Sequence, residues 1–139
     1  MTYQIEDSNK YLPIAKEAAT TAGEYLQKVK GSKLKIIAEP DRDIKLQADI
    51  ESEQIIIDIL RDKSNFPILT EEQGLVNISN VAEEVEYKWI VDPLDGSMNF
   101  ARGFDICCVS IALWENNNPI LGVVYDFNRE ELFTGLISE

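Results

Sequence analysis

The feature that most constrains the fold of this chain is an apolar run that ends abruptly in carboxylates and turn-forming residues. Residues 89–91 (WIV) are typical of a buried strand, and Asp92 and Asp95 follow at its C-terminal end. Gly96 permits a backbone conformation that other residues resist, and Ser97 is a good N-cap for a short helix. Because carboxylates hold hard cations and a helix N-terminus holds anions, this segment suggests a metal-assisted phosphate site.

Composition limits the partners that such a site could serve. The 139 residues suit one domain, and the formal net charge of −12, from 25 acidic and 13 basic residues, disfavours nucleic acids and anionic membranes as partners. The sequence contains no histidine, which excludes His-based acid–base chemistry and leaves hard-metal chemistry through oxygen ligands open. No run approaches transmembrane length and residues 1–10 lack the apolar stretch of a signal peptide, so we expect a cytoplasmic protein.

Two patterns of hydrophobic spacing predict an α+β fold. Apolar residues at three- and four-residue spacing predict one helix over residues 12–30 and another over 48–60. Short apolar runs between turn residues predict strands at residues 34–38, 67–69, 87–91, 106–114, 120–127 and 131–134. Residues 75–86 are polar and irregular, which is typical of a loop. The expected architecture is a single domain over residues 1–139, a two-layer sandwich of two helices on an antiparallel sheet.

The two cysteines are not expected to carry chemistry. Cys107 and Cys108 are adjacent, so in a strand they point to opposite faces. Adjacent cysteines rarely form a disulfide, and the pair lacks the spacing of zinc ligands. We interpret both as small buried hydrophobic residues.

Acidic residues stand at three separate places that a fold could bring together. Asp49 lies near the start of the second predicted helix, where spacing alone favours capping or an interaction with the helix dipole. Glu71 and Glu72 follow an earlier predicted strand, and alone they would be interpreted as a solvated acidic turn. If that strand ends beside the one that carries Asp92 and Asp95, Glu71 could join these carboxylates around one or two Mg²⁺ ions.

Other motifs with clustered carboxylates fit the spacing poorly. An EF-hand loop that began at Asp92 would need ligands at positions three, five and twelve, where the sequence has Leu94, Gly96 and Gly103. Phosphatases of the haloacid-dehalogenase type resemble Asp-x-Asp-Gly, with one residue between the aspartates, whereas two residues intervene here. The purely structural alternative, in which Asp92 and Ser97 only cap a turn and a helix, stays open on spacing alone.

Several separated segments resemble one enzyme family. Residues 92–100 (DPLDGSMNF) and 102–104 (RGF) resemble the signature of the inositol monophosphatase family. Residues 69–72 (LTEE) are similar to its metal-ligand glutamate segment, and residues 43–49 to its acidic helix start. The resemblance implies an αβαβα sandwich and Mg²⁺-dependent, lithium-sensitive hydrolysis of phosphate monoesters, with a sugar or polyol phosphate as substrate.

The resemblance also implies a role for each matching residue in metal binding. Glu71 and Asp92 would share one Mg²⁺, helped by the backbone carbonyl of Leu94, and Asp92 and Asp95 would bind a second. Glu72 is a weaker candidate beside Glu71.

The same resemblance assigns the phosphate site and the catalytic groups. The backbone amides of Gly96 and Ser97 would bind the substrate phosphate. Asp49 and the hydroxyl of Ser97 would orient and activate the attacking water, with Glu71 as a further catalytic residue.

The sequence departs from the family pattern in two local positions and in length. The usual threonine is Ser97 here, which keeps the hydroxyl, and Leu46 stands where members often carry a threonine, which puts a local hydrogen bond in doubt. Family chains are about twice as long, so we expect this chain to be the N-terminal half, without the C-terminal half whose aspartate completes the second metal site. We therefore expect weak or absent hydrolysis by the chain alone.

Alternative functions stay open at this point. One is an inactive, truncated or self-associating fragment that only binds metal. Another is a relative of the 3′(2′),5′-bisphosphate nucleotidase or fructose-1,6-bisphosphatase type, although Asn99 and Phe100 favour the inositol-phosphatase type. An exposed sheet face favours self-association, so we expect a homo-oligomer.

Overall fold

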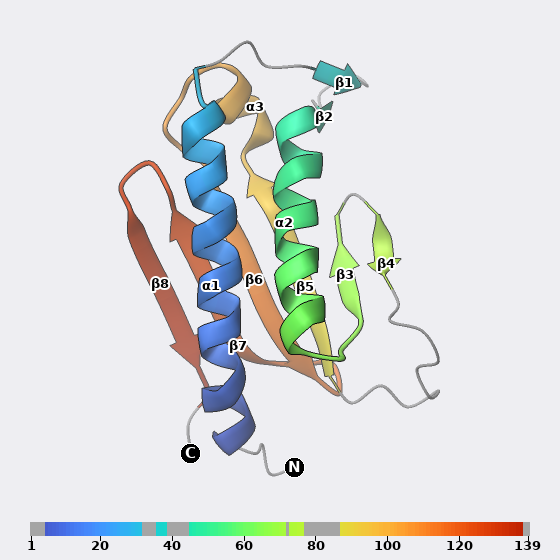
Figure 1. The fold of residues 1–139 in the computed structure, drawn as a ribbon. Helices are drawn as coiled ribbons and strands as arrows, with labels where there is room; N and C mark the ends of the chain where they lie inside the picture. The colour runs from blue at the N-terminus through green and yellow to red at the C-terminus, as the bar shows by residue number, and fades with distance from the viewer. Residues whose placement is uncertain (1–4, 32–35, 39–44, 72, 77–86, 138–139) are drawn as a thin grey trace.

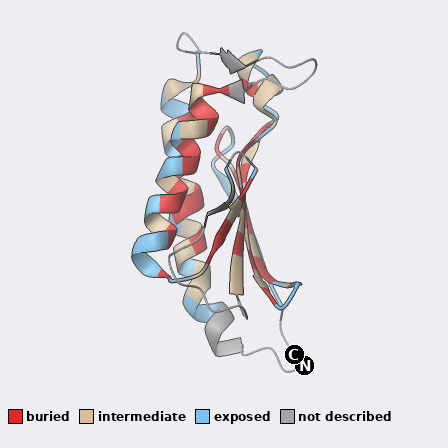
Figure 2. Cartoon of the chain, turned by 90° about the vertical axis from the view of Figure 1, so that its right-hand side faces the viewer, coloured by how far each residue is buried: buried red, intermediate tan, exposed pale blue. Residues whose placement is uncertain are grey.

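A computed structural model describes residues 5–31, 36–38, 45–71, 73–76 and 87–137 of the chain. Its elements in chain order are α1 (Ile5–Val29), β1 (Ile36–Ala38), β2 (Lys45–Leu46), α2 (Gln47–Lys63), β3 (Ile68–Thr70), β4 (Gly74–Val76), β5 (Tyr87–Asp95), α3 (Ser97–Ala101), β6 (Cys108–Glu115), β7 (Asn118–Asp126) and β8 (Glu131–Leu136). Helices α1 and α2 lie side by side on one face of a six-stranded sheet, which confirms the predicted α+β sandwich (Figures 1 and 2). No helix in these residue ranges is both long and apolar enough to cross a membrane.

The sheet has the strand order β4-β3-β5-β6-β7-β8. Strands β5 to β8 form the predicted antiparallel meander, but β3 runs parallel to β5, with Ile68 opposite Trp89 and Thr70 opposite Val91. The sheet is therefore mixed. Strand β4 runs antiparallel along the outer side of β3 and brings the chain back to the end where β3 begins, so that β5 can run parallel to β3. The expectation of an entirely antiparallel sheet was wrong at this one pair. The predicted loop over 75–86 was wrong at its start, which belongs to β4, and residues 77–86 lie outside the described part.

The core lies between the two helices and the sheet. Burial alternates along β6, and its side chains Val109, Ile111 and Leu113 are fully buried under the helices. Helix α1 packs on β6 and β7 and α2 on β5, with a stripe of small buried residues on α1 that lets the backbones approach closely. The largest buried side chain, Trp89 of β5, donates its indole N–H to Ser64 Oγ at 2.9 Å, so its one polar group is satisfied inside the core.

Several element boundaries differ from the predictions for identifiable reasons. Helix α1 begins before the predicted residue 12 and contains Pro13. A proline inside a helix removes a hydrogen bond, and the packing of Tyr11 and Leu12 against the core offsets that loss. Tyr11 meets Phe66 edge-on, with ring centroids 4.9 Å apart.

The region before β6 is irregular rather than extended. The predicted strand over 106–114 begins at Cys108 instead, and Ile106 is 70% exposed. Cys107 is buried and Cys108 is half-buried, and neither forms a disulfide, as predicted.

Candidate active site

The parallel pairing of β3 with β5 brings two of the predicted acidic sites together. Thr70, the last residue of β3, lies opposite Val91, so Glu71 follows β3 at the edge where Asp92 follows Val91. Thr70 Oγ1 accepts a hydrogen bond from the backbone N–H of Gln73 at 2.9 Å, which closes the turn that carries Glu71. The predicted carboxylate cluster required that these two strands end side by side, and they do. Glu72 lies outside the described residues.

Asp92 has the most perturbed electrostatics of this edge. The pKa of Asp92 is raised to about 7, and the largest cause is burial of the side chain. Repulsion by Glu71, a hydrogen bond with Glu71 and repulsion by Asp95 act in the same direction. A hydrogen bond from the Leu94 N–H (3.3 Å) opposes the shift. A carboxylate that shares its surroundings with two others is a group that a cation would stabilise.

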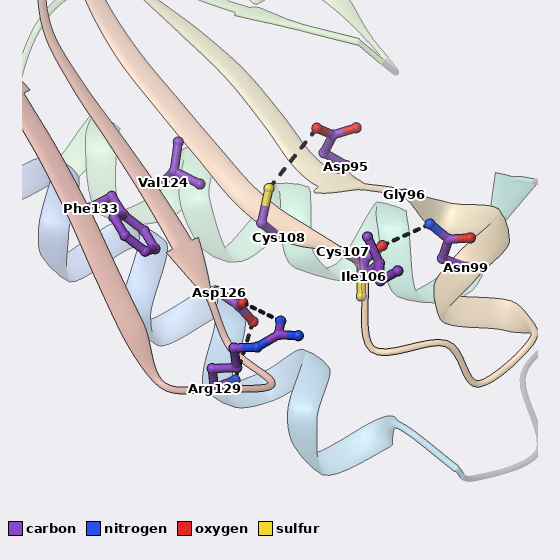
Figure 3. A pocket seen from close by; sticks show the side chains of 10 residues that line it. All are labelled: Asp95, Gly96, Asn99, Ile106, Cys107, Cys108, Val124, Asp126, Arg129 and Phe133. Carbon is purple, nitrogen blue, oxygen red and sulfur yellow. Dashed lines mark hydrogen bonds and ion pairs between the residues drawn. The ribbon is translucent and has the colours of Figure 1, made fainter.

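Asp95 lies beyond an irregularity in the sheet. Pairing between β5 and β6 is continuous to Asp92, opposite Ser110, and resumes only at Asp95, opposite Cys108. Pro93 and Leu94 are buried between them, so the two aspartates emerge on either side of a local bulge. Asp95 is exposed, and its Oδ2 lies 4.0 Å from Cys108 Sγ (Figure 3).

Asp49 and Ser97, which stand 48 positions apart in the sequence, are in direct contact. Ser97 Oγ donates to Asp49 Oδ1 at 2.6 Å, and the Asp49 side chain is 1% exposed. The other oxygen of Asp49 accepts the backbone N–H of Leu46 at 2.9 Å, which holds the first turn of α2. Asp49 therefore caps its own helix, as its position near the helix start favoured, and it also contacts the Ser97 hydroxyl.

A second hydrogen bond fixes α2 against the same loop. Ser52 Oγ donates to Pro93 O at 2.7 Å inside the core. Leu46 precedes the helix and provides no side-chain cap, so the hydrogen bond that a threonine would make at this position is missing, as its substitution predicted. Leu94 O lies 3.1 Å from Ser97 Oγ, and a carbonyl oxygen with two lone pairs retains one for a cation.

Gly96 sits where no larger residue fits. Its φ of 94° is in the left-handed region, and a Cβ at this position would lie 2.8 Å from Ile106 O. Ser97 then opens the short helix α3, and Phe100 N donates to Gly96 O at 2.9 Å. The chain therefore turns sharply and brings the Gly96–Ser97 peptide between the carboxylates and Asp49.

A cavity of about 370 Å³ adjoins Asp95 and Gly96 (Figure 3). Its other walls combine polar and apolar side chains from the neighbouring strands and turns: Asn99, Ile106, Cys107, Cys108, Val124, Asp126, Arg129 and Phe133. Asp126, Arg129 and Phe133 were not predicted as site residues, because their segment has the pattern of a strand, a turn and another strand. Their one signal was the cluster of charges in the turn.

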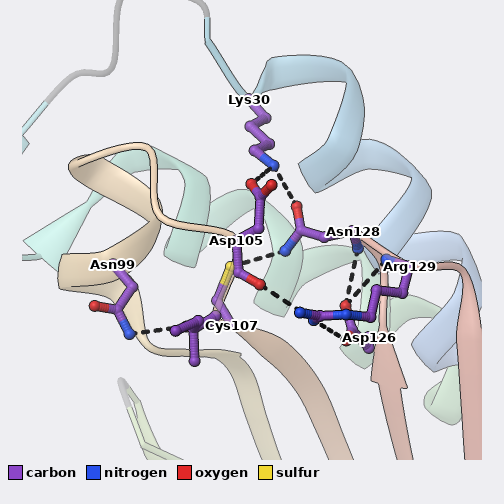
Figure 4. Close-up of polar contacts among 8 residues, drawn as sticks. Lys30, Asn99, Asp105, Cys107, Asp126, Asn128 and Arg129 are labelled. Carbon is purple, nitrogen blue, oxygen red and sulfur yellow. Dashed lines mark hydrogen bonds and ion pairs between the residues drawn. The ribbon is translucent and has the colours of Figure 1, made fainter.

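A group of polar contacts fixes the far wall of this cavity (Figure 4). Arg129 Nη1 donates to Asp126 Oδ2 at 2.8 Å, and this pairing lowers the pKa of Asp126 despite the opposing effect of burial. Lys30, at the end of α1, contacts both Asp105 and Asn128, and Asn128 Nδ2 lies 3.4 Å from Cys107 Sγ. The loop before β6 is thus tied to α1 and to the turn between β7 and β8.

The donors at this edge suit a hard divalent cation in kind. Glu71, Asp92 and Asp95 offer carboxylate oxygens and Leu94 a carbonyl oxygen, which is the ligand chemistry of Mg²⁺ or Ca²⁺. Among the residues that the structure describes, no three Asp, Glu or Cys side chains are gathered closely enough to hold an ion by themselves. The site therefore fits the cation in charge and donor type, and a complete coordination shell would take further ligands such as water.

Comparison with known proteins points to one family. A sequence model of the inositol monophosphatase family matches residues 7–139. An inositol-1-monophosphatase of Synechocystis sp. is 38% identical over 136 residues, which is 95% of this chain and 45% of that protein. A Nus factor SuhB of Pasteurella multocida is 34% identical over 134 residues, 94% of this chain and 49% of that protein.

Solved structures show the same relationship in three dimensions. The extragenic suppressor protein suhB of Bartonella henselae matches with a TM-score of 0.83 at 31% identity, over 92% of this chain and 49% of that one. An inositol monophosphatase of Anabaena matches with a TM-score of 0.74 at 36% identity, over 92% and 44%. This chain thus spans about half the length of the relatives that it matches, in accord with the predicted half-length relationship. Given a match over residues 7–139 and a shared fold, the chain belongs to the inositol monophosphatase family.

Proposed function

We propose that this chain contributes to metal-dependent hydrolysis of a phosphate monoester, with a sugar or polyol monophosphate as the substrate class. The observation that carries the proposal is that Glu71, Asp92 and Asp95 lie near one another at one edge of the sheet. The chain turns beside them at Gly96, and the hydroxyl of the next residue, Ser97, contacts the buried Asp49. Family membership supports phosphatase chemistry.

In this proposal, Glu71, Asp92, Asp95 and the carbonyl of Leu94 hold Mg²⁺. The cation, when bound, offsets the charge of the phosphate and lowers the pKa of a water molecule. Asp92 has the central place, because both Glu71 and Asp95 act on it. Its raised pKa implies that the metal-free site takes up a proton that metal binding releases.

The remaining groups of the chain position the water and the phosphate. Ser97 Oγ donates a hydrogen bond to Asp49 Oδ1, so its lone pairs are available to accept a hydrogen bond from a water on the open side. Asp49 is buried and fixed by the Leu46 N–H, which keeps Ser97 in one orientation. The amides of Gly96 and Ser97 are proposed to hold the phosphate oxygens.

The cavity wall favours a monophosphate over a bisphosphate. Among the described residues its charged side chains are Asp95, Asp126 and Arg129, and Arg129 is already paired with Asp126. A second phosphate would meet excess negative charge, whereas hydroxyl groups of a polyol can bond to all three side chains. The negative charge therefore disfavours the alternative bisphosphatase function. That alternative has to be tested, because a relative from Aquifex aeolicus is named fructose-1,6-bisphosphatase/inositol-1-monophosphatase.

The proposal is tested first by metal binding and then by hydrolysis. Calorimetric titration with Mn²⁺ should show a large loss of affinity in Asp92→Asn and a smaller loss in Asp49→Asn, with Asp62→Asn as a control on the exposed side of α2. Equal losses in the first two variants would contradict the assignment of Asp92 as the shared ligand. Metal binding does not require turnover, so the test holds even if the chain hydrolyses nothing alone.

Hydrolysis is measured as Mg²⁺-dependent phosphate release from inositol monophosphate and from fructose 1,6-bisphosphate. Because the chain spans about half the length of its relatives, we expect slow release from the 139-residue chain alone. Fast release by this chain would contradict that expectation, and a preference for the bisphosphate would contradict the charge argument. Lithium sensitivity and a cytoplasmic location stay predictions from the sequence.

A further inference from the structure

Ser52 of α2 makes a hydrogen bond that its own helix does not require. The side chain is 0% exposed, and its Oγ donates to Pro93 O at 2.7 Å, 41 positions further along the chain. A serine inside or at the end of a helix can bond instead to the carbonyl four residues before it, as Ser64 Oγ does at 2.6 Å. The contact of Ser52 therefore ties α2 to the segment that separates Asp92 from Asp95.

The carbonyl that Ser52 contacts lies in the irregular part of the sheet. Residues 92–95 of β5 pair with residues 108–110 of β6, so β5 carries one residue more over this stretch. Such a bulge interrupts the hydrogen bonds between the two strands. Pro93 is buried and has no N–H, so its carbonyl is the only backbone group through which it can be hydrogen-bonded. Ser52 supplies that hydrogen bond.

One peptide unit connects this hydrogen bond to Asp92. The carbonyl of Pro93 and the N–H of Leu94 belong to the same planar trans peptide, so they point in opposite directions. The Leu94 N–H donates to Asp92 Oδ1 at 3.3 Å. Because the peptide is rigid, the direction in which Ser52 holds the carbonyl also sets the direction of the N–H that reaches the Asp92 carboxylate.

The same helix holds the other end of the segment. Asp49 precedes Ser52 by three residues, so both side chains lie on one face of α2. Asp49 Oδ1 accepts a hydrogen bond from Ser97 Oγ at 2.6 Å. One turn of a helix thus fixes the chain at both Pro93 and Ser97. Groups that hold a ligand side chain in place before the ion arrives contribute to the affinity of a metal site.

We propose that Ser52 is a positioning residue for the metal site: through the peptide between Pro93 and Leu94, it keeps the Asp92 carboxylate in the orientation that binds a divalent cation. The inference rests on the proposed function, in which Asp92 is the shared ligand. Without the Ser52 hydroxyl, the buried carbonyl of Pro93 loses this partner, which favours rotation of the peptide toward water. Rotation would turn the Leu94 N–H away from Asp92.

Amide hydrogen exchange of the metal-free chain tests the orientation of this peptide. In Ser52→Ala, we expect the Leu94 amide to exchange at least about tenfold faster than in the unmodified chain, because the peptide opens locally. Ser64→Ala is the matched control, since it also removes a buried serine hydroxyl, at the other end of α2. It should change the exchange of the Leu94 amide by less than about twofold. Unchanged exchange in Ser52→Ala, or equal acceleration in both variants, would overturn the proposal.

Calorimetric titration with Mn²⁺ measures the consequence for the cation. We expect the dissociation constant to rise at least about tenfold in Ser52→Ala and less than about twofold in Ser64→Ala. Ser52→Thr keeps the hydroxyl and should restore tight binding. Circular dichroism checks that each variant is folded, and the two alanine variants decide the question if threonine does not fit the core.

The titration separates failure of the inference from failure of the proposed function. Equal Mn²⁺ affinity of Ser52→Ala and the unmodified chain would overturn the role of Ser52 and leave the metal site standing. A folded Ser52→Thr variant that binds as weakly as Ser52→Ala would also overturn that role. If the unmodified chain does not bind Mn²⁺, the proposed function fails, and the role of Ser52 fails with it.

Discussion

Replacing Gly96 by alanine should destabilise the protein more than the same change at Gly103, and the difference measures how tightly the turn at Gly96 is packed. Both glycines have positive φ, 94° and 79°. Alanine in this region costs about 1–2 kcal/mol, of which roughly 0.4–1 kcal/mol is returned because the unfolded chain loses freedom. This leaves a net loss of about 1 kcal/mol at either position.

Only Gly96 adds a steric penalty. A Cβ there would lie 2.8 Å from Ile106 O and 3.1 Å from Cys107 Cβ, whereas nothing lies within 4 Å of the corresponding position at Gly103. The close atom is backbone, so the loop before β6 must move, at a cost of about 1–3 kcal/mol. We therefore expect a loss of about 2–4 kcal/mol for Gly96→Ala and about 1 kcal/mol for Gly103→Ala.

Urea unfolding followed by tryptophan fluorescence measures both losses. Trp89 is buried in the core, so its emission reports global unfolding. The slope of the unfolding free energy against urea should stay unchanged, so that the midpoint alone shifts. Equal midpoints for the two variants would refute the packing argument. A change confined to Gly103→Ala would refute it more strongly.

Three further predictions concern the other contacts of the site and core. Asp92→Asn should stabilise the metal-free chain at pH 8 while weakening metal binding. The pKa of Asp92 in the folded chain, about 7, lies above the ordinary 3.8, so folding favours the neutral carboxyl. The contribution of this group to the free energy of unfolding is therefore complete below about pH 4 and is lost as pH rises through 7. The shift corresponds to at most about 4 kcal/mol, and partial exposure reduces this to about 1–2 kcal/mol, measurable as a higher urea midpoint that vanishes near pH 4. Ser64→Ala should lower the thermal stability by about 1–3 kcal/mol, because it leaves the buried indole N–H of Trp89 without its partner; an unchanged melting temperature would contradict this. In any assembly that hydrolyses inositol monophosphate, Ser97→Ala and Asp49→Asn should each lower kcat by about 10²-fold or more, whereas Ser97→Thr should retain activity. The double variant should lose little activity beyond the larger single effect, because the two residues act as a unit. Multiplicative losses would show that they do not.

The local patterns of the sequence predicted most of the elements, but not all of their neighbours. Apolar spacing located both long helices and the meander from β5 to β8, because each of these elements buries one regular face. Strand β4 has only three residues and no regular apolar spacing. Without β4 in the prediction, it could not be deduced that the chain returns to the start of β3 and that β5 pairs parallel to β3. The sheet was therefore predicted with the wrong direction at one pair.

The same limit applies to the candidate site. Asp92, Asp95 and Gly96 lie in one short segment, so their grouping could be recognised from the sequence. The contact of Asp49 with Ser97 depends on how α2 sits on the sheet, and spacing alone favoured the simpler role of helix capping. Arg129 gave only the signal of a charged turn, and a charged residue in a hairpin turn is ordinarily solvated. Only the packing of the turn beside the loop before β6 places Arg129 on the cavity wall.

The double contact of Asp49 has a consequence for the order in which the protein folds. Its bond to the Leu46 N–H lies within one helical turn, whereas its bond to Ser97 closes a loop of 48 residues and requires α2 to be packed on β5. Loop closure of this length is paid for in chain entropy before the contact can form. We therefore expect the helix cap to be present in the folding transition state and the Ser97 contact to be absent from it. Ser97→Ala should then accelerate unfolding and leave the folding rate unchanged, because the Asp49–Ser97 contact forms only after the transition state.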